Sequence, residues 1–444
     1  METNLQKTSA ILVALALALA LTACGGTASK IGETVKGERV AILESTRKLE
    51  ADKGMSEIKP VLPNPALNLE WMQAGYDSSH VMPPSALSAA PQKIWSRDIG
   101  RGSNSDYKLL ASPVIGNGAV LTMDAVGTVQ AFDAATGEPK WKTVTNPENS
   151  DEKTIGGGIA LDRNAVYATT GFGEVLALDA QSGRVLWRRS VINPVRAAPT
   201  FSQGRIYVVT IDNRLTALDS RTGNILWHHN GVSENATLMG ASSPAAMGDN
   251  VVVAYSSGEI YNLRAANGRA SWSYALTSPA QVGALPAIAD IRGLPVIDRG
   301  RIYAIGHSGR MAAIDQRTGD RVWEADLGGI QTPLVLNDTV FVLGNDAQLA
   351  AIQSSTGRVL WVKALQQRVD PADSSSDFVH WAGPIAGGGK LWLANSRGQL
   401  MSFAPADGAE GETVDIGSSV FVPPVIANGT LYVVTDRGRL IALR

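Results

Sequence analysis

The sequence predicts an all-β protein, an eight-bladed β-propeller whose ring is closed by a strand from the N-terminal part of the chain. Three observations predict this fold. One phrase recurs six times with 38 to 51 residues between successive copies. Short alternating runs lie between turn signals, and one strand is missing at the C-terminal end while a spare one stands near the start. Self-similarity at such spacings is typical of stacked or circular repeats.

The repeated phrase is roughly Ala-Leu-Asp-x-x-Thr-Gly-x-x-Leu-Trp, which indicates a hairpin and an outer strand. Its aspartate can accept bonds from turn N–H groups, and its glycine takes the positive φ that the turn needs. The phrase ends at Trp141, Trp187, Trp227, Trp272, Trp323 and Trp361. A buried indole removes roughly 150–250 Å² from water, so we expect one tryptophan per blade to dock on a neighbour. The pattern resembles the docking motif of quinoprotein-type (PQQ-like) propeller repeats, a likeness that does not by itself imply the quinone cofactor.

Each phrase follows shorter runs that complete a four-stranded unit. An apolar run usually opens at a proline, as in the SPVI run from Ser112, and a β-branched run follows, as in the IYVV run from Ile206. Short alternating runs between turns are antiparallel strands, and proline at a strand's first position removes no ladder bond. Each repeat is therefore predicted to be one propeller blade.

The irregular ends of the repeat set the number of blades. Seven strand openings contain a proline, and the GIAL run from Gly158 supplies an eighth. One further tail has decayed, with Glu412 in the tryptophan position, and the last blade stops at Arg444 without a tail. Trp95 lies in a strand that has no blade before it. We predict that this strand completes the last blade and closes the ring; seven blades is the alternative.

The start of the chain indicates export. Residues 1–23 contain Lys7 and then an apolar stretch that is too short for a membrane span and is typical of a cleaved signal. The run from Leu21 to Gly25 resembles the bacterial lipobox, which implies lipidation at Cys24 and cleavage before it; a chance cysteine is the alternative. Cys24 is the only cysteine, so no disulfide can form within the chain. The glycines that follow imply anchoring at the periplasmic face of the outer membrane.

The predicted domain organisation has three parts. Residues 1–23 form the signal peptide, residues 24–90 a lipidated tether and extended segment, and residues 91–444 the propeller. The middle part is polar and proline-rich, with Trp71 and Met72 as candidate anchors on the ring. Such a tether would hold the propeller near the membrane without setting its orientation.

Composition and motifs argue against a catalytic function and against nucleic-acid binding. The formal net charge is −2 and no basic stripe occurs. The five histidines lack metal-ligand spacing, and no nucleophile elbow, phosphate loop or His-Glu-x-x-His motif is present. The aspartates at 133, 179, 219 and 315 recur in register, which is typical of turn caps. We therefore expect no catalytic residue, no metal and no cofactor.

Interruptions of the repeat are the candidate binding elements. Asp290 and Arg292 lie in the longest insertion, between Trp272 and Trp323. They are interpreted either as an ordinary surface salt bridge or as part of a recognition loop on one face of the ring, because binding residues concentrate on loops.

Lipobox, tether and eightfold repeat together resemble the BamB (YfgL) lipoprotein family of the outer-membrane β-barrel assembly machinery, over essentially the whole mature chain. In that family two adjacent inter-blade connections face the periplasmic domains of the barrel-forming subunit. One has a Leu-Arg-Gly-x-Ser-x-Pro pattern, and the other an acidic pair before a proline strand. The positions that match or replace these patterns are the implied partner-binding residues Leu238, Met239, Gly240, Ser242, Asp290 and Arg292, with Pro244 also matching. Met239 replaces the arginine and Arg292 the second acid, which suggests altered charges on the partner.

The resemblance implies a non-enzymatic scaffold that binds the barrel-forming subunit and aids folding and insertion of β-barrel outer-membrane proteins. Unfolded clients are further candidate partners, through strand addition at a blade edge. A quinone-dependent periplasmic dehydrogenase is one alternative, opposed by the single cysteine and the absence of long insertions. A lipoprotein that binds cell wall or polysaccharide is the other.

Overall fold

The computed structural model describes residues 49–55, 57–147, 152–234, 238–276 and 290–444. They belong to one compact unit that spans Leu49–Arg444. The predicted signal peptide and Cys24 lie outside the described residues. No helix in the described part of the chain is long and apolar enough to cross a membrane.

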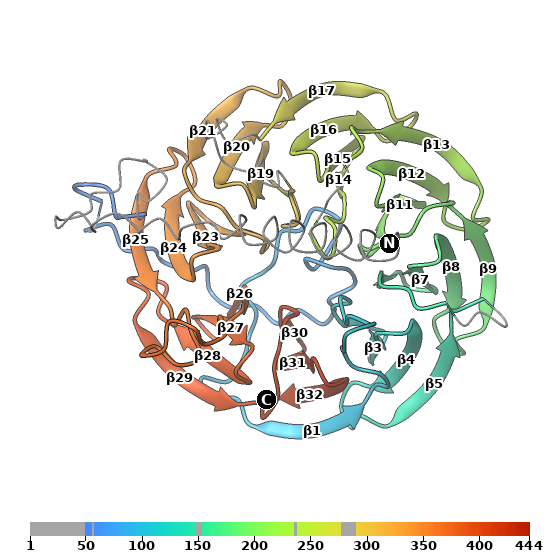
Figure 1. Cartoon of the computed structure of the whole chain (residues 1–444), viewed down its shortest axis with the longest axis horizontal. Coiled ribbons are helices and arrows are strands. Elements are labelled where there is room, and N and C mark those ends of the chain that lie inside the picture. Colours follow the sequence, from blue (N-terminus) through green and yellow to red (C-terminus); the bar gives the residue numbers. More distant parts are fainter. Residues whose placement is uncertain (1–48, 56, 148–151, 235–237, 277–289) are drawn as a thin grey trace, which may run out of the picture. The chain divides into compact units, whose positions relative to one another are not determined.

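Eight four-stranded antiparallel sheets form a ring, which confirms the predicted eight-bladed propeller (Figure 1). Blade 1 contains β2 (Val114–Gly116), β3 (Ala119–Met123), β4 (Thr128–Asp133) and β5 (Pro139–Val144). Blade 2 contains β6 (Gly157–Leu161), β7 (Ala165–Thr170), β8 (Glu174–Asp179) and β9 (Val185–Ser190). Blade 3 contains β10 (Thr200–Ser202), β11 (Arg205–Val209), β12 (Arg214–Asp219) and β13 (Ile225–Asn230). Blade 4 contains β14 (Ala245–Met247), β15 (Asn250–Ala254), β16 (Glu259–Arg264) and β17 (Ala270–Ala275).

The second half of the ring repeats the same order. Blade 5 contains β18 (Val296–Asp298), β19 (Arg301–Gly306), β20 (Arg310–Asp315) and β21 (Arg321–Ala325). Blade 6 contains β22 (Leu334–Leu336), β23 (Thr339–Leu343), β24 (Gln348–Gln353) and β25 (Val359–Ala364). Blade 7 contains β26 (Trp381–Gly387), β27 (Lys390–Asn395), β28 (Gln399–Phe403) and β29 (Glu410–Asp415). Blade 8 contains β30 (Val425–Ala427), β31 (Thr430–Thr435), β32 (Arg439–Leu443) and, from the other end of the chain, β1 (Lys93–Asp98).

Strands within a blade differ in burial because neighbouring blades cover the inner strands on both faces. Every residue of β3 is buried, and so are most residues of β4. The outer strand β5 instead alternates between half-buried and exposed residues. This explains the continuous apolar runs of the inner strands and the mixed composition of the outer ones.

The repeated tryptophans join consecutive blades. Each indole N–H donates to a backbone carbonyl in the hairpin turn of the next blade. The pairs are Trp141 with Ala180 (3.1 Å), Trp187 with Ser220 (3.0 Å), Trp227 with Ala265 (2.9 Å), Trp272 with Gln316 (2.9 Å), Trp323 with Ser354 (2.8 Å) and Trp361 with Pro405 (2.9 Å). The ring lies directly against the turn glycine: a Cβ on Gly183 would be 2.4 Å from Cε3 of Trp141. The glycine is needed for this close approach as well as for its positive φ.

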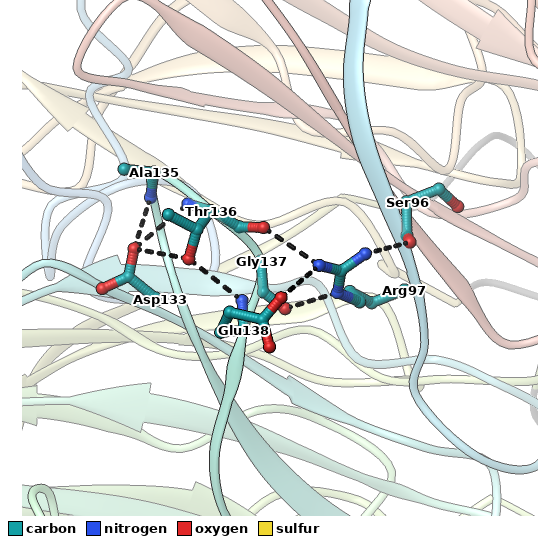
Figure 2. Close-up of polar contacts among 7 residues, drawn as sticks. All are labelled: Ser96, Arg97, Asp133, Ala135, Thr136, Gly137 and Glu138. Atoms are coloured by element: carbon teal, nitrogen blue, oxygen red, sulfur yellow. Dashed lines mark hydrogen bonds and ion pairs between the residues drawn. The ribbon is translucent and has the colours of Figure 1, made fainter.

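Strand β1 closes the ring by pairing antiparallel with β32, so that Trp95 lies opposite Ala442. Figure 2 shows how Arg97, two residues after Trp95 in β1, is bonded to blade 1. The Arg97 guanidinium donates to Gly137 O (2.8 Å) and Thr136 O (3.2 Å) and pairs with Glu138 (2.8 Å). In the same turn Asp133 accepts the Thr136 N–H (3.1 Å) and hydroxyl (3.2 Å), as expected of a turn cap.

The decayed tail of blade 7 has a structural reason. In blade 8 the two outer strands, β32 and β1, come from distant parts of the sequence and are not joined by a Thr-Gly hairpin. Arg444 instead exchanges two backbone bonds with Gln92 (2.8 and 2.9 Å), so among the described residues no glycine turn receives a docking indole there. The polar, exposed Glu412 therefore stands where the other tails have tryptophan.

Residues 66–88 cross the interior of the ring (blue in Figure 1) and bond the edges of the innermost strands. Trp71 exchanges two backbone bonds with Ile115 of β2 (2.8 and 2.7 Å). Further bonds join Asn68 to Ile426, Met72 to Leu161, Gln73 to Phe201, Ser78 to Ala246, Ser79 to Ile297 and Ser85 to Ala386. Innermost strands have one edge facing the ring axis, and this segment satisfies part of those edges.

Candidate partner-binding face

The two loops implied by the family resemblance are neighbours on one end of the ring. Each blade is an antiparallel meander, so its Thr-Gly turn lies at one end and its connections to neighbouring blades lie at the other. Residues 238–244 connect blade 3 to blade 4, and residues 290–295 connect blade 4 to blade 5. Residues 277–289, most of the longest insertion, lie outside the described residues.

Three contacts lock these loops together. The Leu238 N–H donates to Asp290 Oδ2 at 2.7 Å. The Ser242 hydroxyl donates to Gly293 O at 3.1 Å. Gly240, with φ +97°, allows Arg292 to lie against its backbone: a Cβ there would be 2.9 Å from Nε. The structure thus brings five of the six predicted residues into one contact network, in which Gly240 is required by the close approach.

Burial separates the structural members of this network from the exposed one. Asp290 is 2% exposed, and its backbone carbonyl also accepts the His307 N–H (2.9 Å). Burial raises the pKa of the Asp290 carboxyl, while the Leu238 N–H and the Arg292 charge act to lower it. Burial lowers the pKa of Arg292, whereas the negative charge of Asp290 acts to raise it. Asp290 is therefore a buried acceptor that joins two loops, which differs from the surface salt bridge considered for it. Met239 is 40% exposed and presents its side chain to solvent.

A cavity of about 150 Å³ lies inside the ring next to these loops. Its lining includes residues that precede or begin the innermost strand of every blade, together with Trp71, Ala74, Gly75 and Met82 of the N-terminal segment. Gly240 and Arg292 are part of this lining as well. The two-loop network therefore forms part of the cavity wall.

A family model described as outer membrane protein assembly factor BamB matches residues 125–363 of this chain. The chain belongs to the BamB family.

Individual relatives agree with this assignment. The BamB protein of Salmonella typhimurium is 27% identical over 360 residues, covering 80% of this chain and 88% of its own length. The BamB protein of Xanthomonas campestris is 34% identical over 252 residues, covering 55% and 61%.

Solved structures show the shared fold. The crystal structure of BamB from Moraxella catarrhalis matches with a TM-score of 0.65 at 18% identity, covering 80% of this chain and 98% of that one. Quinohemoprotein alcohol dehydrogenase from Comamonas testosteroni matches with a TM-score of 0.66 at 14% identity, covering 86% of this chain and 81% of that one. Identities this low establish a common propeller and nothing about activity.

Sequence reasoning did not find Arg196 or the cavity that it lines. Arg196 follows Pro194 in the connection before β10 and carries no motif. Its neighbours in the cavity wall come from blades far away in the chain, so nothing local marks it. Trp71 was predicted as a candidate anchor on the ring, although its place in the cavity lining had no sequence signal.

Proposed function

We propose that this BamB-family chain is a non-enzymatic scaffold lipoprotein of outer-membrane protein assembly, which binds the periplasmic domains of a barrel-forming subunit. Family membership carries the proposal, since the matching relatives are named as outer membrane protein assembly factors. The buried network around Asp290 supports it, because it makes two adjacent loops into one preorganised surface. Met239 is the exposed apolar residue that this surface presents.

The chain offers a matched pair of methionines for testing the surface. Met239 and Met247 are both 40% exposed. Met239 lies in the loop before β14, whereas Met247 is the last residue of β14, beside the turn at the opposite end of the blade. Met239→Asp should abolish co-purification with the barrel-forming subunit from membranes solubilised in mild detergent, because it places a charge in an apolar contact. Met247→Asp should leave co-purification intact. Retention of the partner by the Met239→Asp protein would show that the contact lies elsewhere.

We further propose the three-part organisation predicted above, with signal peptide 1–23, lipidated tether and extended N-terminal segment 24–90, and propeller 91–444. Lipidation at Cys24 would hold the propeller at the periplasmic face of the outer membrane. Cys24→Ser should move the protein from the membrane fraction to the soluble periplasmic fraction, as seen by fractionation and immunoblotting. An unchanged membrane fraction would exclude Cys24 as the anchor.

Unfolded clients are proposed to add a strand at the outer blade edges. Outer strands expose paired apolar residues next to a free edge, such as Val185 and Leu186 in β9 and Ile225 and Leu226 in β13. A photo-crosslinker scanned along β9 and β13 should capture nascent outer-membrane proteins. Capture confined to the inter-blade loops would contradict strand addition.

A further inference from the structure

The cavity inside the ring has an unusual charge pattern. Among the residues that the structure describes, its lining contains two arginines, Arg196 and Arg292, and no aspartate or glutamate. The charge of Arg292 is partly balanced by the buried Asp290, which acts to raise the pKa of this arginine and is not part of the cavity lining. Arg196 forms no ion pair with any residue that the structure describes. Among the described residues the cavity is therefore electropositive, with at least one cation that none of them neutralises.

Two N–H donors at the cavity also have no acceptor. The Nε–H of Arg196 and the indole Nε1–H of Trp71 are buried, and neither bonds a protein atom within the described part of the chain. Both residues line the cavity, Trp71 from the N-terminal segment and Arg196 from the connection to blade 3. Buried donors without partners are costly, at about 1–3 kcal/mol each. Because neither donor atom is accessible to solvent, a ligand in the cavity would have to meet Arg196 through the terminal nitrogens of its guanidinium.

Part of the remaining wall is apolar, beside the polar lining residues Ser112, Ser243, Gln331 and Thr332. Leu109, Met82, Ile385 and Val422 are buried residues of the lining, and Phe421 stands partly exposed at the cavity. A cavity of about 150 Å³ is large enough for a benzene-sized group. The ligand that fits has one anionic end and one compact apolar body.

We propose that this cavity binds the carboxylate of a small apolar acid, with the carboxylate at Arg196 and Arg292 and the apolar body against the Leu109–Phe421 wall. The planar guanidinium binds a carboxylate through two parallel bonds, which a point cation does not. Gly240 supports the site because its missing side chain leaves room for Arg292. Such a carboxylate can belong to a free acid or to the last residue of a peptide, and binding of either goes beyond the scaffold role.

Calorimetric titration of the full chain tests the site, with 3-phenylpropionate, its amide, and N-acetyl-phenylalanine as probes. The free acid should bind and the amide at least about 10-fold more weakly, because it lacks the charge-assisted bonds. Binding of N-acetyl-phenylalanine as well would assign the site to a peptide C-terminus, and binding of phenylpropionate alone to a free acid. No binding of either acid at millimolar concentration, or equal binding of acid and amide, would overturn the proposal.

Variants localise the binding. Arg196→Gln should weaken the acid about 10- to 100-fold, in proportion to one or two charge-assisted bonds. This variant is the decisive one, because Arg196 makes no structural ion pair among the described residues, whereas Arg292 also packs on Gly240. Arg221→Gln, at an exposed turn on the other end of blade 3, should bind like the parent chain. If Arg196→Gln, folded by circular dichroism, binds unchanged, the carboxylate does not lie where we place it. Co-purification of the barrel-forming subunit, tested at Met239, is a separate readout that either result leaves unaffected.

Discussion

Replacing Trp227 by phenylalanine should destabilise the propeller more than the same replacement at Trp95. The two tryptophans are closely matched: they are 9% and 8% exposed, and each ring centroid lies 5.9 Å from that of a tyrosine. Each also packs on the turn glycine of the next blade. They differ in the indole N–H, which donates to Ala265 O at 2.9 Å in Trp227. For Trp95 the equivalent acceptor, Ala134 O, is taken by the Tyr432 hydroxyl at 3.1 Å.

The size of the difference follows from these bonds. Both variants lose similar apolar contact, so that loss cancels in the comparison. Trp227→Phe also removes a bond and leaves the carbonyl of the buried Ala265 without its donor, a cost of about 1–3 kcal/mol. Trp95→Phe removes an N–H that has no partner among the described residues. Urea unfolding of the full chain, followed by far-UV circular dichroism with unchanged m-values, should therefore show a deficit of about 1–3 kcal/mol for Trp227→Phe relative to Trp95→Phe. Losses equal within about 0.5 kcal/mol, or a larger loss at Trp95, would refute the assigned role of the indole bond.

Two further predictions concern the turns and the N-terminal segment. Gly223→Ala should lower the free energy of unfolding by about 1–3 kcal/mol more than Gly204→Ala in the same assay. Both glycines have a positive φ, so that strain is shared. Only at Gly223 would the added Cβ meet an indole ring, 2.7 Å from Trp187 Cε3. Equal costs would mean that the indole can shift. Burial lowers the pKa of His80, although its bond to Pro295 O acts to raise it. The folded protein therefore favours the neutral imidazole, and this stabilisation is complete above about pH 6.5 and is lost as the pH falls below that value. His80→Asn, which suits the φ of +64°, should reduce the drop in melting temperature between pH 7.5 and 5.5. An unchanged drop would exclude His80 as the source of this pH dependence.

The blades could be predicted from the sequence because their determinants are local and repeated. Asp, Thr-Gly and Trp occupy fixed offsets, and the geometry shows why: the aspartate caps the turn, and the glycine of that turn receives the indole of the preceding blade. Closure by the strand that contains Trp95 followed from counting strands at both ends of the chain. The polar residue at Glu412 looked like decay, whereas the structure shows that no docking turn is present beside it.

The candidate site was less predictable because its contacts are not local. The burial of Asp290 depends on Leu238 in another loop, and a charged side chain in a long insertion looks exposed. The path of residues 66–88 has no periodicity, since single residues bond the edges of successive blades. Arg196 faces a cavity whose walls come from all eight blades, which no window of the sequence contains.

The pairing of Trp95 with Ala442 has a consequence for the order of folding. The two residues are 347 positions apart in the sequence, so this pairing is far less local than the strand pairings within the other blades. Contacts between distant residues form more slowly than local ones, so the blades between β1 and β32 can form before these two strands meet. The contacts of Arg97 with Gly137 and Glu138 in blade 1 need only a nearby part of the chain, so β1 can bind blade 1 while its edge toward β32 is still unpaired. Sealing the ring is then the final step of maturation, and a chain cut short by a few residues would remain an open arc.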